Sequence, residues 1–188
     1  MTLTSLLPTL RRILPDPIRE AVWPEHTHAT TTDVVVAGIS LLRLVELCQT
    51  PCVHTGDAAI SGAHTRSALR RDRAVVVVRV TAVLKNWDAA PVVLIDACLD
   101  TVPAVWSETR LIGRTSTAKA TTAIVVGGDS HQASCTERGV VALPADLREG
   151  DLLAIPCTGM VTLRDLRPQQ HARNNAPGPD RLDPSMLS

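Results

Sequence analysis

The chain has 188 residues, the usual size of one domain and enough to bury a hydrophobic core without disulfides or a metal. Hydrophobic residues make up 45% of it and charged residues 20%, which excludes a fully disordered or fibrous protein. Nineteen basic residues balance nineteen acidic ones, so we expect no broad cationic surface and no nucleic-acid partner. There is no Tyr or Phe, and lysine chemistry has two candidates, Lys85 and Lys119.

The expected location is the cytoplasm. No apolar run approaches the ~20 residues of a membrane span, and the first residues lack the pattern of a signal peptide, so no membrane partner is expected. The odd number and irregular spacing of the cysteines predict reduced thiols rather than a disulfide framework. The five are Cys48, Cys52, Cys98, Cys135 and Cys157.

Residues 1–20 have apolar side chains at helical spacing and are broken by two prolines near their end. This predicts an amphipathic N-terminal helix that docks on the body of the protein or on a partner. Its apolar side carries Leu3, Leu6, Leu7, Leu10 and Ile13.

Residues 21–166 are expected to form a single domain. After a polar, irregular stretch at 23–32, residues 33–37 are a β-branched strand ended by glycine. Ser40 then caps a helix that the Thr50-Pro51 pair ends. Residues 56–73 are polar and aperiodic, which indicates a loop.

Strands dominate the rest of the domain. The valine run at 75–83 predicts a central strand covered on both faces, and a hairpin connects it to a second strand at 92–99. Further strands are expected at 110–115, 122–126, 139–143, 151–156 and 161–166. Short strands at this spacing predict a mainly β fold, an antiparallel barrel-like domain with one or two short helices near the N-terminus. Residues 167–188 have the composition of a disordered tail.

Two clusters could in principle hold a metal. Cys48, Cys52 and His54 offer soft ligands, but they straddle a helix end and lack a second pair, so buried thiols are favoured. His26 and His28 lie in a threonine-rich loop and are read as solvated. We therefore expect no metal site.

Two segments resemble the flanking parts of diaminopimelate decarboxylases. The first consists of Trp23-Pro24, residues 36–47, Thr50-Pro51 and Val53, and it is similar to the strand, helix and Gly-Thr-Pro by which that family enters its catalytic barrel. Residues 143–156, followed by 158–162, resemble the Leu-Pro to Gly-Asp-Leu-Leu strand and Gly-Ala-Tyr end of its C-terminal β domain. Between the two, the family has an (α/β)8 barrel of roughly 250 residues, and here residues 56–73 stand in its place.

The resemblance implies that the reactive groups are lost. The family's pyridoxal-phosphate lysine and phosphate loop belong to the missing barrel, and neither lysine of this chain has that context. At positions that match the family's β-domain motifs, Ser116 replaces a catalytic cysteine, Thr117 an acid, Ala120 an aspartate and Val161 a tyrosine. The resemblance also implies that residues 33–37 pair into the sheet formed by 75–166.

The sequence therefore favours a non-catalytic, stand-alone β domain that acts as a structural or interaction module. Its expected partner is a second copy of the chain or a decarboxylase-like protein, met through the apolar side of residues 1–14. One alternative is an accessory chain of a pyridoxal-phosphate-dependent decarboxylase in lysine or polyamine metabolism. Another is an unrelated β-barrel that binds a small ligand. No cofactor is expected, except pyridoxal phosphate if a barrel-bearing chain is the partner.

Overall fold

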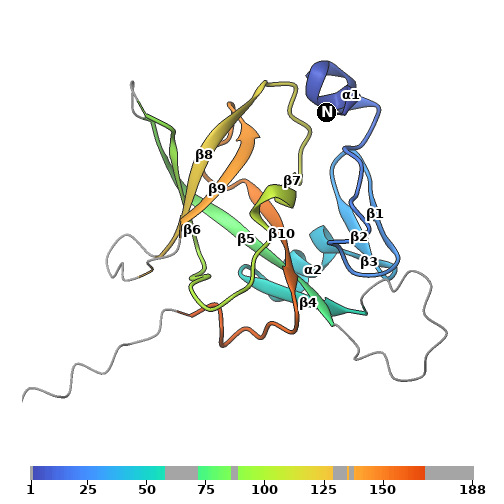
Figure 1. Cartoon of the computed structure of the whole chain (residues 1–188), viewed down its shortest axis with the longest axis vertical. Helices are drawn as coiled ribbons and strands as arrows, with labels where there is room; N and C mark the ends of the chain where they lie inside the picture. Colours follow the sequence, from blue (N-terminus) through green and yellow to red (C-terminus); the bar gives the residue numbers. More distant parts are fainter. Residues whose placement is uncertain (1, 58–71, 86–88, 129–134, 136–137, 168–188) are drawn as a thin grey trace, which may run out of the picture.

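The structure is a computed structural model that describes residues 2–57, 72–85, 89–128, 135 and 138–167 (Figure 1). Its strands are β1 (Thr27–Ala29), β2 (Val34–Val36), β3 (Ile39–Ser40), β4 (Cys52–Gly56), β5 (Arg73–Leu84), β6 (Val92–Ile95), β7 (Arg110–Ile112), β8 (Ala120–Gly127), β9 (Arg138–Pro144) and β10 (Leu152–Thr158). Its helices are α1 (Leu3–Leu6) and α2 (Leu41–Cys48), with 3₁₀ segments at Pro8–Arg12 and Trp106–Glu108. The mainly β fold predicted from the sequence is confirmed.

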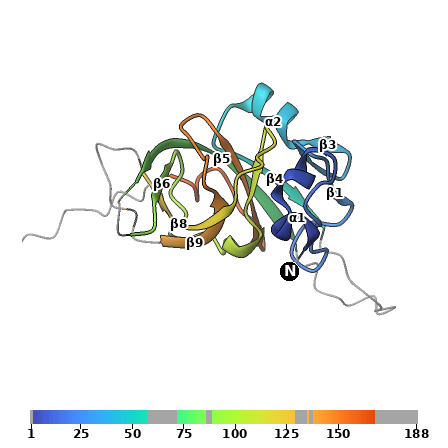
Figure 2. The ribbon, with the colours of Figure 1, turned by 90° about the horizontal axis from the view of Figure 1, so that it is seen from above.

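The strands form two sheets. The larger has the order β7-β10-β5-β6-β8-β9, with β4 paired to β5 beside this path. Its pairings are antiparallel apart from the parallel pair β6–β8. This sheet curls into a half-barrel, which Figure 2 shows from above. Strands β1, β2 and β3 form a small separate sheet on the side of the molecule that also carries α1 (Figure 1).

Strand β5 runs through the middle of the molecule with both faces buried. Val76, Val78 and Val80 pack into the larger apolar cluster, whereas Val75 and Val77 pack into a second cluster on the opposite face. Successive side chains of a strand point to opposite faces, so an unbroken run of valines suits a strand with apolar neighbours on both sides. The predicted central strand is confirmed.

The two halves of β5 have different neighbours. Its first half pairs with β10 and β4, and its second half pairs with β6 from Val80 onward. The register shifts between Val80 and Ala82, at the point where the partners change. An irregularity of this kind bends a strand and increases its twist, which lets one long strand serve both parts of a curled sheet.

Helix α2 is capped as the sequence predicts. The backbone N–H of Arg43 donates to the Ser40 hydroxyl at 3.0 Å, and this hydroxyl donates to Asp33 at 2.5 Å. The other carboxylate oxygen of Asp33 accepts the N–H of Leu42 at 3.2 Å. Two side chains therefore satisfy two of the free N–H groups of the first turn.

The prediction that residues 33–37 pair into the sheet of residues 75–166 is wrong. Strand β2 lies between β1 and β3 in the small sheet. Val34 and Val36 still meet Val75 and Val77, but as side chains packed in one apolar cluster. The apolar pattern of residues 33–37 predicts burial and says nothing about whether the contact is made by hydrogen bonds or by side chains.

Three further expectations about strands need correction. Strands β1 and β4 were not expected in their polar surroundings. The strand predicted at 92–99 ends at Ile95, because the next side chain, Asp96, turns to accept the backbone N–H of Arg79 at 2.8 Å. Residues 161–166 are not a strand, since Asp165 accepts both the N–H and the hydroxyl of Thr162 at 2.8 Å and closes a turn.

The expected N-terminal helix is two short segments, α1 and the 3₁₀ turn Pro8–Arg12. Pro8 has no N–H to donate, so an α-helix cannot continue through it unbroken. Residues 58–71 of the expected 56–73 loop, residues 86–88 of the hairpin and residues 168–188 of the expected tail lie outside the described residues. Among the helices of the described part, none is long and apolar enough to cross a bilayer.

The packing of β5 makes a stability prediction. Val76→Ala removes two methyl groups from the larger apolar cluster, and Val77→Ala removes two from the second cluster. Each variant should lower the free energy of unfolding by about 2 kcal/mol. Val140→Ala on β9 is the matched control, because that side chain is 63% exposed and should cost less than about 0.5 kcal/mol. Urea unfolding followed by tryptophan fluorescence measures all three. A small cost at only one of the two core valines would contradict the two-faced packing.

Candidate functional site

Ser116, which matches the catalytic cysteine position of the resembled family, is built into a turn. It is 3% exposed, and its hydroxyl donates to an oxygen of Asp146 at 2.6 Å. The same hydroxyl accepts the backbone N–H of Ala118 at 3.1 Å. With both contacts made, the hydroxyl holds the turn between β7 and β8 in place.

Arg114 is the centre of the charged network around this turn. Its Nε and Nη2 donate to the two carboxylate oxygens of Asp151, each at 2.7 Å. Its Nη1 donates to Asp146 at 3.1 Å. The Asp151 carboxylate also accepts the backbone N–H of Arg148 at 2.9 Å and is almost fully buried. A two-pronged pair of this kind fixes both the distance and the orientation of its partners.

The network shifts the pKa values of Arg114 and Asp146. The hydrogen bond to Asp151 is the main cause of a raised pKa at Arg114. Burial alone would raise the pKa of Asp146, but hydrogen bonds from Ser116 and Arg114 outweigh it and lower that pKa. A lowered carboxylate pKa stabilises the fold above the ordinary carboxylate value, and this contribution is lost as the pH falls through the lowered value.

Of the other positions matched by the sequence resemblance, two lie in or at the end of this turn and one lies in the apolar core. Thr117 is partly buried in the same turn and Ala120 begins β8. Val161 is 4% exposed and packs in the larger apolar cluster. Lys85 and Lys119 are both exposed, and the backbone carbonyl of Lys119 accepts the N–H of Ala145 at 3.0 Å. The charged network was not found from the sequence, because Arg114 and Asp151 are 37 residues apart.

The structure places the two candidate metal clusters as follows. Cys48 is exposed at the end of α2, whereas Cys52 is buried in β4. Burial is the main cause that raises the pKa of Cys52 to about 11, and the nearby Cys48 and Asp96 raise it further. The Cys52 thiol therefore stays protonated at neutral pH.

His26, from the second candidate cluster, lies 3.9 Å from Glu25 at the surface. Among the described residues, the group whose ligand atoms lie close enough for one ion is a different one, Cys98, Asp100 and Cys135.

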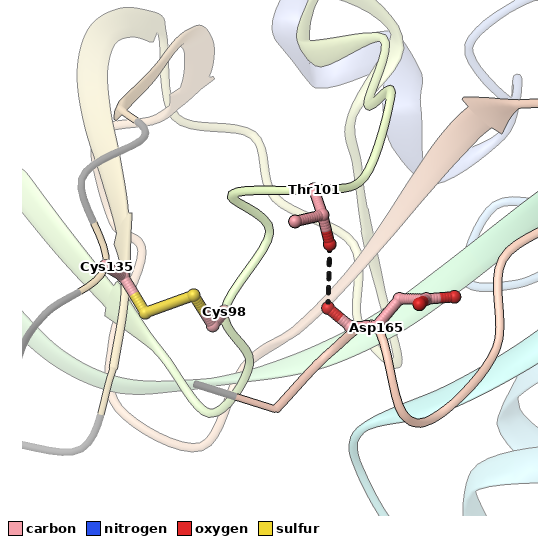
Figure 3. Close-up of a disulfide and its surroundings, with 4 residues drawn as sticks. All are labelled: Cys98, Thr101, Cys135 and Asp165. Atoms are coloured by element: carbon pink, nitrogen blue, oxygen red, sulfur yellow. Dashed lines mark hydrogen bonds between the residues drawn. A yellow bond between two sulfur atoms is a disulfide. The ribbon is translucent and has the colours of Figure 1, made fainter. Parts of the chain in front are cut away.

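The expectation that all cysteines are reduced is wrong for two of them. Cys98 and Cys135 form a disulfide, drawn in Figure 3, while Cys48, Cys52 and Cys157 are free. The two sulfurs are 37 residues apart in sequence and meet because the chain folds back through β8. Spacing alone could not reveal this contact.

Two of the cavities among the described residues are large enough to consider as binding sites. One, of about 100 Å³, is polar and lies between the N-terminal region and the half-barrel, with Arg11, Asp16, Asp33, Arg110 and Arg114 among its lining residues. The other, of about 250 Å³, is more apolar and opens beside β5, β6, β8 and β9, with Lys85 in its lining. Neither was expected from the sequence, because each is lined by several separate segments.

Most apolar side chains of the N-terminal segment (residues 3–14) are exposed to solvent. Leu3 is 66% exposed, Leu6 61%, Leu7 55% and Ile13 71%. Leu10, expected on the same side, is half-buried. The segment therefore does not cover the body of the protein with these side chains.

The fold and these sites define a mainly β half-barrel with a small accessory sheet. No protein-family model matches the sequence, and no curated protein matches it. Among solved structures, a diaminopimelate decarboxylase is similar at 19% sequence identity and a TM-score of 0.32. The match covers 49% of this chain and 26% of the decarboxylase chain. It is a distant similarity, and the activity of that enzyme is not transferred to this chain.

The network around Arg114 predicts a large stability effect. Arg114→Met should lower the free energy of unfolding by about 3–5 kcal/mol, because it leaves the Asp151 carboxylate buried without its partner. Arg43→Met is the control, since Arg43 and Glu46 form an ion pair whose side chains are both more than half exposed, and it should cost about 0–0.5 kcal/mol. Chemical denaturation gives both values. Equal costs for the two variants would show that Arg114 is an ordinary surface charge.

Proposed function

We propose that this chain is a non-catalytic interaction module that self-associates through its N-terminal segment. The observation that carries the proposal is the exposure of Leu3, Leu6, Leu7 and Ile13, joined by Leu14 at 45%. Soluble proteins rarely leave a contiguous set of large aliphatic side chains in water unless another surface covers it. In the described residues, eleven large hydrophobic side chains are exposed, and five of them belong to this one short segment.

Polar contacts hold this segment against the half-barrel and leave four of its five leucines, all but Leu10, exposed. The Nη1 of Arg11 donates to the backbone carbonyl of Ala118 at 3.2 Å, and its Nε lies 3.3 Å from Asp16. Arg110 on β7 donates to the carbonyl of Asp16 at 2.6 Å and to that of Pro17. These bonds fix the C-terminal side of the segment, while Leu3, Leu6, Leu7 and Ile13 stay exposed.

The segment also needs a partner for its own helical structure. Helix α1 has four residues and no side-chain cap. A helix this short is unstable in water by itself, and most helical stability in proteins comes from packing an apolar face. Docking would supply that packing.

A second copy of the chain is the partner we favour. The formal net charge is zero, so long-range repulsion does not oppose association. A two-fold dimer brings the same patch of both copies together, and an apolar patch is complementary to itself. In the sequence, the positions that match the family's cysteine and tyrosine carry Ser116 and Val161, which supports a role without catalysis.

Sedimentation velocity tests this proposal. The full chain should run as a dimer at micromolar concentration, and the double variant Leu3→Glu/Leu7→Glu should run as a monomer with an unchanged circular dichroism spectrum. Leu163→Glu is the matched control, because Leu163 is 54% exposed elsewhere on the surface and should leave the dimer intact.

Two results would contradict self-association. One is a wild-type chain that stays monomeric at high concentration, and the other is a dimer unaffected by the double variant. A wild-type monomer that binds a barrel-bearing decarboxylase through residues 3–14 would instead favour the accessory-chain alternative, with pyridoxal phosphate on the partner.

The apolar cavity favours a second candidate function, binding of a small ligand. Its wall includes Val83, Val93 and Leu147, and Lys85 supplies a cation beside this apolar surface. Such a combination suits a short aliphatic carboxylate, whose chain enters the cavity while its charge meets the ammonium group.

A fluorescent fatty acid is the probe for this candidate. The probe should bind the wild-type chain and bind Lys85→Met about fivefold more weakly, a change of about 1 kcal/mol. Lys119→Met is the control, since Lys119 is exposed and outside the cavity lining. Equal affinity for all three proteins would exclude a role of Lys85 in binding, and no binding would exclude the candidate.

A further inference from the structure

The turn that follows β6 is held rigidly and carries two side chains able to bind a metal. The backbone N–H of Cys98 donates to the carbonyl of Leu166 at 2.9 Å. The N–H of Val102 donates to the carbonyl of Leu99 at 3.0 Å. Backbone of the same turn packs directly on Gly127, where a Cβ would collide with the Ala97 carbonyl oxygen. The backbone of this turn therefore holds Cys98 and Asp100 in place.

Cys135 meets this turn from the connection between β8 and β9. Figure 3 shows its sulfur joined to that of Cys98, close to the contact between Thr101 and Asp165. A carboxylate oxygen of Asp100 and both sulfurs all lie within 4.8 Å of one another. The cluster combines one fully buried thiol position, Cys98, with a partly exposed one, Cys135.

The cluster is compact enough for one zinc ion once the disulfide is reduced and its two sulfurs separate, since its ligand atoms all lie within 4.8 Å of one another. With Zn–S distances of about 2.3 Å and Zn–O distances of about 2.0–2.2 Å, tetrahedral ligand atoms lie roughly 3.5–3.8 Å apart. Two thiolates and a carboxylate are all ordinary zinc ligands, whereas calcium and magnesium require oxygen alone. Three protein ligands leave a fourth position for water.

We propose that Cys98, Cys135 and Asp100 form a zinc site when the cysteines are reduced, and that the disulfide is the closed, metal-free state of the same site. A dithiol reductant breaks the S–S bond and is itself oxidised to a disulfide, which transfers two electrons and leaves two thiols. These lose two protons as one Zn²⁺ binds to the two thiolates and to the Asp100 carboxylate. The same sulfur atoms cannot serve both states, so zinc and the disulfide exclude each other.

Both states join the same two segments, the turn after β6 and the β8–β9 connection. The disulfide joins them by a covalent bond, and zinc would join them by binding Cys98, Asp100 and Cys135 at once. Because the ion binds the folded chain at a site assembled by the fold, zinc should raise the melting temperature of the reduced protein and leave that of the oxidised protein unchanged.

Metal titration of the full chain tests the site directly. The reduced wild-type chain should take up one equivalent of zinc, and cobalt in its place should give a thiolate-to-cobalt charge-transfer band. The oxidised wild-type chain, with the disulfide verified by thiol counting, should give neither signal. This comparison uses one protein in two redox states, so it does not depend on any variant folding.

Variants then identify the ligands. Cys98→Ser should abolish the cobalt band, and Asp100→Asn should weaken zinc binding by about tenfold or more. Cys48→Ser is the matched control, because Cys48 is a free, exposed cysteine outside the cluster and should leave binding unchanged. The proposal is overturned by a reduced chain that binds no zinc, by zinc binding to the oxidised chain, by full affinity in Asp100→Asn, or by loss of binding in Cys48→Ser.

Discussion

The alternating burial of the valines on β5 is the constraint on which the rest of the structure depends. Val76 and Val78 face the interior of the half-barrel, while Val75 and Val77 face the cluster that also holds β2 and α2. The strand is thus a shared wall between two apolar clusters. It must be covered on both sides, because an aliphatic face left in water would lose the free energy that orders the strand. The position of the small sheet follows from this need.

Around this wall, arginines make the polar connections between segments distant in sequence. Arg114 joins the β7–β8 turn to the start of β10 through Asp151, and Arg110 joins β7 to the chain at Asp16 and Pro17. The guanidinium group suits this task because its donors lie in one plane and reach two acceptors at once. These bonds satisfy buried or half-buried polar groups where no strand pairing can do so.

The sites that we connect with function are supported by this framework. The exposed leucines sit on a segment held by polar bonds at one side, and the cysteine pair lies beside a turn that packs on Gly127. In both places the fold supplies the support: the leucines are exposed on it, whereas Cys98 is buried beside it.

The sequence by itself determined the features that depend on local chemistry. The valine run predicts a strand buried on both faces, since its side chains are β-branched and do not alternate between apolar and polar. Ser40 predicts the start of α2, since the hydrogen bond of its cap spans only the three residues to Arg43. The tertiary structure alone decided what β2 pairs with, which cysteines meet and which carboxylates surround Arg114. Those contacts join residues that are far apart in the chain. The spacing and periodicity of the residues in the sequence do not indicate which distant surfaces come together when the sheet curls.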